Sequence, residues 1–203
     1  MERTTLEAVA SNYTYLRGLL AVPLGMLMIL AALGNWAWGP LRHAWVFVAC
    51  ALAVAALALA LVRYYNEHYG RITASVRQHA RGAFAAVVNL VLVLGGSLLL
   101  RSDADWSLDL PVNALAAALA AGFLGYYAVT VGVKPHHVVI WASVLVAALL
   151  PVWGSLDLSD TSNVGLVLAG VAAMASGVFD HRFLARSFGR AHGLDPKAGD
   201  LRA

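Results

Sequence analysis

Six stretches of the chain contain no Asp, Glu, Lys or Arg and are each long enough to cross a lipid bilayer. They cover residues 18–41, 44–62, 82–100, 110–133, 135–156 and 161–179. A helix rises about 1.5 Å per residue, so about 20 residues span the hydrocarbon layer. With 61% hydrophobic residues, a soluble chain of this length would expose apolar surface that it could not hide. The sequence therefore predicts an all-α, polytopic membrane protein.

The charge-free stretches predict six transmembrane helices arranged as three hairpins, spanning about 18–36, 44–62, 83–100, 112–132, 138–154 and 163–179. Residues 1–16 are too polar to insert and are expected to form an interfacial segment, residues 17–180 the six-helix domain, and residues 181–203 a basic cytoplasmic tail. We expect the first span to be retained rather than cleaved as a signal peptide, because it continues through Trp36 and Trp38.

The basic residues predict the orientation of these helices. With both termini in the cytoplasm, only Arg42 and Arg101 of the 14 Lys and Arg residues lie outside. Cytoplasmic loops normally carry the excess of Lys and Arg, so this orientation in a plasma or bacterial inner membrane is favoured over its reverse. The same rule accounts for the basic isoelectric point, and no nucleic-acid partner is expected.

Two further patterns bear on packing. Trp106-Ser-Leu-Asp-Leu leads into Asn113, and Trp153-Gly-Ser-Leu-Asp-Leu leads into Asn163, which is a faint repeat between the second and third hairpins. Duplication and coincidence explain it equally well. Small residues four apart, such as Ala169, Ala173 and Gly177, allow close approach of helices, either within the monomer or across a homo-oligomer interface.

The interior of the predicted spans carries few polar groups. The candidates for lining a pore or ligand site are Asn89, Tyr126, Tyr127 and Thr130. Carriers driven by protons or ions usually keep a charged or imidazole side chain at membrane depth, so a proton-driven pump is disfavoured.

Polar chemistry gathers instead at the predicted cytoplasmic ends. The basic residues expected to contact a partner or anionic lipid are Arg63, Arg71, Arg77, Arg81, Lys134 and Arg182. Candidate acid/base residues are Glu67, His68, Asp180 and His181. Adjacent helical residues point about 100° apart, which weakens Asp180 and His181 as a direct pair. No cofactor is expected, although zinc held by His68, His136, His137 and His181 is an alternative.

These features favour a non-enzymatic accessory or sensory membrane subunit, whose His-containing cytoplasmic rim engages anionic lipid or a protein partner. The reasons are the absence of charge inside the predicted spans, the rows of small residues and the polar cytoplasmic rim. One alternative is a small transporter or channel for a neutral or amphiphilic solute. Another is a membrane-embedded enzyme that modifies lipids with the cytoplasmic His, Glu and Asp residues.

Overall fold

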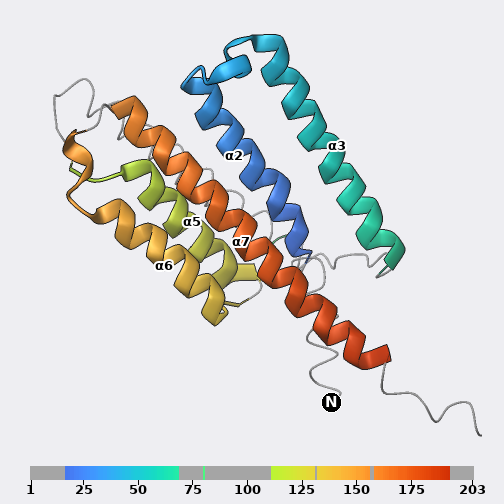
Figure 1. The fold of residues 1–203 in the computed structure, drawn as a ribbon. Coiled ribbons are helices and arrows are strands. Elements are labelled where there is room, and N and C mark those ends of the chain that lie inside the picture. Colours follow the sequence, from blue (N-terminus) through green and yellow to red (C-terminus); the bar gives the residue numbers. More distant parts are fainter. Residues whose placement is uncertain (1–16, 69–79, 81–110, 131, 156–157, 193–203) are drawn as a thin grey trace, which may run out of the picture.

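The computed structural model describes residues 17–68, 80, 111–130, 132–155 and 158–192. Within these residues the protein is all-helical and has no strand, as the sequence predicts (Figure 1). The α-helices are α2 (Ala21–Asn35), α3 (Ala44–His68), α5 (Ala114–Thr130), α6 (Pro135–Leu149) and α7 (Leu158–His192). Short 3-10 helices are η1 (Gly18–Leu20), η2 (Gly39–Arg42) and η3 (Trp153–Ser155). The predicted span 83–100, the predicted segment 1–16, and Arg71, Arg77, Arg81 and Asn89 lie outside the described residues.

Three helical segments in the described part of the chain are long and apolar enough to cross a membrane, judged by length and composition. They are Gly18–Asn35, Ala44–His68 and Asp160–Arg186. Helices α5 and α6 are apolar but shorter. The all-helical class and the apolar character of the helices are thus confirmed, and both are compatible with membrane insertion.

The helix bounds differ from the predicted span bounds at several ends. Helix α3 continues past residue 62 to His68, α6 is shifted toward the N-terminus, and α7 continues past residue 179 to His192. Residues 181–192, the first part of the predicted cytoplasmic tail, thus continue helix α7. A charge-free run marks the hydrocarbon boundary and not the end of the helix, because Arg, Glu and Leu all favour helix in water.

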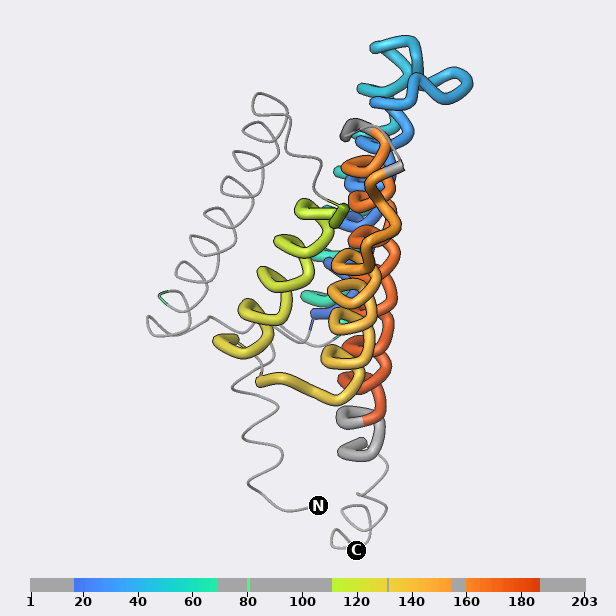
Figure 2. The backbone as a smooth tube through the Cα atoms, turned by 90° about the vertical axis from the view of Figure 1, so that its left-hand side faces the viewer, coloured from blue at the N-terminus to red at the C-terminus, as the bar shows by residue number. Residues whose placement is uncertain are grey.

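Helix α7 lies at the centre of the described bundle. Helix α2 runs antiparallel along one side of α7, α3 lies beyond α2, and the α5–α6 hairpin packs on the other side (Figure 1). The main core lies between α5, α6 and α7, where Leu119, Trp141 and Ala173 are buried. From the side, the α2–α3 connection and the α5–α6 connection lie toward opposite ends of the bundle (Figure 2). We call these ends the Trp36 end and the Asp180 end.

Helices α2 and α7 approach so closely that their glycines face each other. Gly25 of α2 lies against Gly170, and Gly18 of η1, which leads into α2, lies against Gly177, so the two contacts are seven positions apart along each segment. A Cβ atom at any of these four positions would overlap the backbone of the opposite helix. Ala169 and Ala173 are also fully buried in the monomer. This favours the intramolecular use of the small-residue row on α7.

Side-chain amides organise the Trp36 end. Asn113 is fully buried and caps α5, accepting a hydrogen bond at Oδ1 from the Ala116 N–H (2.9 Å) and donating from Nδ2 to the Thr161 carbonyl (2.6 Å). Asn35 donates to Asn163 Oδ1 (2.9 Å), which ties α2 to the start of α7. The two asparagines of the faint repeat thus lie at the same end, each bonded near the start of α7.

Candidate functional site

A tight connection between α5 and α6 sets the geometry of the Asp180 end. Helix α5 ends where Gly132 adopts a φ of 80°, which favours glycine, and the Gly132 N–H donates to the Tyr127 carbonyl (2.9 Å). Lys134 is extended, as expected before a proline, and Pro135 begins α6. Lys134, His136 and His137 are therefore all presented from the connection and the first turn of α6.

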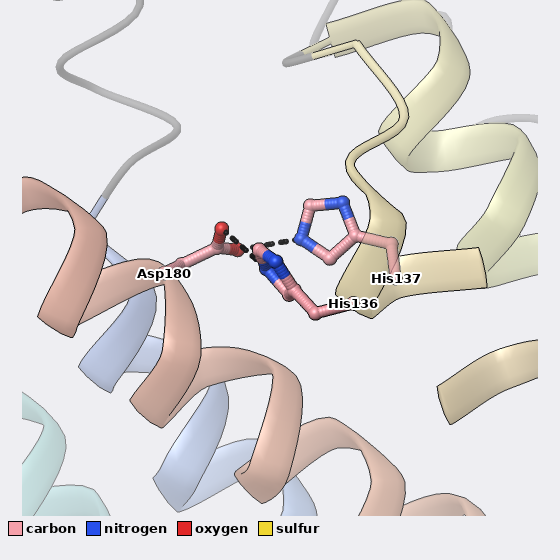
Figure 3. A group of neighbouring side chains, drawn as sticks. All are labelled: His136, His137 and Asp180. Atoms are coloured by element: carbon pink, nitrogen blue, oxygen red, sulfur yellow. Dashed lines mark hydrogen bonds and ion pairs between the residues drawn. The ribbon is translucent and has the colours of Figure 1, made fainter. Parts of the chain in front are cut away.

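Asp180 on α7 gathers these three side chains. Its Oδ1 lies 2.9 Å from Lys134 Nζ and 3.2 Å from His136 Nε2, and its Oδ2 lies 3.0 Å from His137 Nε2. Figure 3 shows both imidazoles directed at the carboxylate across the space between α6 and α7. We call Asp180, Lys134, His136 and His137 the Asp180 cluster.

Burial makes the charge balance of the cluster important. The side chains of Asp180 and His137 are 2% and 0% exposed, whereas those of Lys134 and His136 are 18% and 22% exposed. A buried carboxylate without a counter-charge is strongly destabilising, and Lys134 supplies that charge here. The site is therefore closed toward the core and partly open on the side of Lys134 and His136.

The backbone selects the neutral form of His137 that can bond Asp180. The Lys134 N–H, which can only donate, lies 3.4 Å from His137 Nδ1. This makes Nδ1 the acceptor and places the proton of the neutral ring on Nε2, which then donates to Asp180 Oδ2. The Lys134 ammonium also sits 4.2 Å from the centre of the Phe183 ring, so two side chains of α7 hold it, Asp180 and Phe183.

Two aromatic stacks connect the Asp180 cluster to the apolar core. Tyr127 stacks on His137 with 3.6 Å between ring centres, and Phe123 stacks on Trp141 with 4.2 Å. Phe123 and Tyr127 lie four residues apart on α5, and His137 and Trp141 lie four residues apart on α6. Four residues are about one helical turn, so the two stacks follow each other along the helix pair. The position of His137 is thus fixed by Tyr127 as well as by Asp180.

His181 faces a different set of partners from those of its neighbour Asp180. Its Nδ1 lies 3.0 Å from the hydroxyl of Tyr65, and the same hydroxyl accepts a hydrogen bond from the Leu19 N–H (3.1 Å). Tyr65 is fully buried. Asp180 therefore contacts the α5–α6 connection, while His181 contacts Tyr65 of α3, whose hydroxyl also bonds η1. Different partners are expected for adjacent residues on a helix.

The remaining sequence candidates fall into three groups. Glu67 and His68 are exposed on the last turn of α3, where the His68 ring packs on Tyr64 at 4.3 Å, and neither belongs to the Asp180 cluster. Tyr126 and Tyr127 meet edge to face, and the Thr130 hydroxyl donates to the Tyr126 carbonyl (2.6 Å), so both Thr130 and Tyr127 have local packing and bonding roles. Arg63 and Arg182 are exposed at the Asp180 end.

The sequence predicts the candidate histidines at the cytoplasmic ends of the spans but does not show which of them lie together. Of His68, His136, His137 and His181, the structure brings His136 and His137 together with Asp180, and separates them from the other two. Tyr65 was missed altogether, because a tyrosine near a helix end is more often a packing residue. Its buried hydroxyl, which must find a partner, is visible only in the fold.

Comparison with known proteins gives no match: no protein family, no curated protein and no solved structure is significantly similar to this chain. The class of this protein therefore rests on its fold and its site. The described chain is a bundle of apolar helices, compatible with a membrane protein, with a buried carboxylate–imidazole–ammonium cluster at one end.

Proposed function

We propose that this protein is a non-enzymatic accessory or sensory subunit of a plasma or bacterial inner membrane. It crosses the bilayer six times as three hairpins, and both termini and the Asp180 end face the cytoplasm. The Asp180 cluster responds to a ligand, and the exposed basic residues around it engage a protein partner or anionic lipid.

The observation that carries this proposal is the composition of the Asp180 cluster. A carboxylate on α7 that is 2% exposed depends on an ammonium and two imidazoles from the α5–α6 connection and the first turn of α6. A ligand that binds any of these groups removes one of the contacts with Asp180. It therefore changes how the α5–α6 connection is held against α7. His181, the next residue, bonds Tyr65 of α3, and Tyr65 in turn bonds η1, so a shift of α7 at this point would also move the contacts of α3 and η1.

The charge distribution supports the proposed location of the partner surface. The side chains of Arg63, Arg182 and Arg186 are exposed at the Asp180 end, and Arg42 is exposed near the Trp36 end. Each basic residue near an anionic membrane surface contributes about 1 kcal/mol of attraction, so this end suits anionic lipid or an acidic protein surface.

Labelling of single cysteines tests the proposed orientation. In a Cys50→Ala background, Arg42→Cys should react with a membrane-impermeant thiol reagent in intact cells. Arg186→Cys should react only after the membrane is permeabilised. Both positions are exposed, so access to the side chain does not limit either reaction. Reaction of Arg186→Cys in intact cells would overturn the orientation and the cytoplasmic placement of the Asp180 end.

Recovery of a partner tests the accessory role. Isolation in mild detergent with crosslinking and mass spectrometry should recover a stoichiometric partner or a homo-oligomer. The double variant Arg182→Glu with Arg186→Glu should lower recovery by at least about tenfold, since each basic residue contributes about 1 kcal/mol near an anionic surface. Arg42→Glu, the matched reversal near the other end, should recover as much as the wild type. A strictly solitary monomer would contradict the proposal.

A membrane-embedded lipid-modifying enzyme is a second candidate, favoured by the contacts of Asp180 with His136 and His137, which resemble an acid/base arrangement. In this version the reacting residues are His136 and Asp180 instead of Glu67, His68 and His181. Lipid turnover that is lost in His136→Gln would favour it over the accessory role. For the transporter alternative, the pore candidate Asn89 lies outside the described residues, and the candidates Tyr126, Tyr127 and Thr130 have local packing and bonding roles.

A further inference from the structure

We infer that His136, His137 and Asp180 bind a divalent transition-metal ion of the zinc class, which replaces the Lys134 ammonium as the counter-charge of Asp180. This inference rests on the proposed sensory function and deepens it by naming the chemical class of the ligand.

The first argument is the spacing of the donor atoms. One ligand atom from each of the three residues can be chosen so that all lie within 4.8 Å of one another. The Asp180 oxygens lie 3.2 Å from His136 Nε2 and 3.0 Å from His137 Nε2. Donors bound tetrahedrally to zinc at about 2.0–2.2 Å are separated from each other by roughly 3.3 Å. The side chains therefore need only small rotations to place the three donors around one ion.

The second argument is the chemistry and burial of the donor set. Two imidazoles and a carboxylate are ligands that zinc accepts, and three protein ligands leave a fourth position open. His137 and Asp180 are almost fully buried, whereas His136 is 22% exposed. The buried pair would fix the ion, and the exposed side of the cluster would give access to it and to the open position.

The third argument is that the Lys134 ammonium occupies the position that the metal ion would take. Its ammonium lies 2.9 Å from the same Asp180 oxygen that His136 contacts. A divalent ion bound there repels the ammonium, and a side chain that is 18% exposed can turn its charged end outward. Lysine and metal ion are thus alternative counter-charges, which predicts competition between them.

Metal binding would also change the start of α6. An imidazole that coordinates through Nε2 carries its remaining proton on Nδ1, where His137 now accepts from the Lys134 N–H across 3.4 Å. That long hydrogen bond must be given up, and the Lys134 side chain leaves Phe183 as it turns outward. The ion therefore shifts the α5–α6 connection between two arrangements, as a sensor requires.

The test uses the full chain in mild detergent, with a purification tag that contains no histidine. Wild type should bind one equivalent of Zn²⁺ in a calorimetric titration, and Co²⁺ in its place should give the visible absorption of a four-coordinate ion. His136→Gln should weaken binding at least about 100-fold, because even the loss of an outer-shell partner costs 10–100-fold. The exposed histidines provide matched controls, and His43→Gln and His68→Gln should bind like the wild type.

Lys134→Met distinguishes a metal site from a purely structural ion pair. Removal of the competing ammonium should tighten Zn²⁺ binding about tenfold or more, and Zn²⁺ should raise the unfolding temperature of this variant more than that of the wild type. Circular dichroism of each variant verifies that it is helical.

The inference is overturned if wild type binds no equivalent of Zn²⁺, if His136→Gln binds as tightly as wild type, or if Lys134→Met binds more weakly. Any of these results leaves the recovery of a partner unaffected, so it would refute the ligand without refuting the accessory function. Loss of the partner with intact Zn²⁺ binding would refute the accessory function without refuting zinc as the ligand.

Discussion

Gly25→Val is expected to force α2 away from α7 and to destabilise the protein by about 3 kcal/mol, the upper part of the range for overpacked interiors. A Cβ at Gly25 already overlaps the Gly170 carbonyl oxygen and lies 2.6 Å from Met174 Cγ. The obstacle is backbone, which cannot rotate away as a side chain can, so the two helices must separate. The change should appear as a lower midpoint in an unfolding titration of detergent-solubilised protein with denaturing detergent.

Gly125→Val provides the matched control on α5. It is the same substitution in a helix, but a Cβ at Gly125 would meet nothing within 4 Å. Valine favours helix over glycine by a few tenths of a kcal/mol, so stability should change by less than about 0.5 kcal/mol. Equal effects at Gly25 and Gly125 would show that α2 and α7 do not pack through their glycines.

The sequence was sufficient to predict the helical class and the position of most helices, because charge-free runs of this length seldom adopt any structure other than a helix. It could not predict that α7 continues to His192, since the polar residues after Asp180 are compatible with helix or with coil. It also could not show that Gly18 and Gly25 face Gly177 and Gly170. A small-residue row identifies a surface for close packing, but the choice of partner helix depends on the whole bundle.

The candidate site was predictable residue by residue but not as an arrangement. Lys134, His136, His137 and Asp180 each stood out as polar residues at the ends of apolar runs. Their pairing joins residues more than 40 positions apart and depends on how the α5–α6 hairpin lies against α7. The separation of Asp180 from His181, in contrast, follows from helical geometry alone, and the structure agrees with it.

Asp180→Ala is expected to cause the largest loss of stability at the Asp180 end, about 3–5 kcal/mol, which is typical for removing one partner of a buried ion pair. The carboxylate is the acceptor for Lys134, His136 and His137. Lys134 and His136 can turn toward solvent, but His137 is 0% exposed and held by Tyr127, so its Nε2–H would stay buried without an acceptor. Asp180→Asn keeps one acceptor oxygen and should lose less stability than Asp180→Ala.

Asp160→Ala is the matched control, because it removes a carboxylate from the opposite end of the same helix. Asp160 accepts a hydrogen bond from Trp36 Nε1 (2.7 Å) at an exposed position, where water can replace it. The expected loss is therefore about 1 kcal/mol or less. Unfolding titrations of both variants under one set of detergent conditions make the comparison. If Asp160→Ala and Asp180→Ala lose the same stability, the Asp180 cluster does not hold α5 and α6 against α7, and the coupling on which the sensory proposal depends is absent.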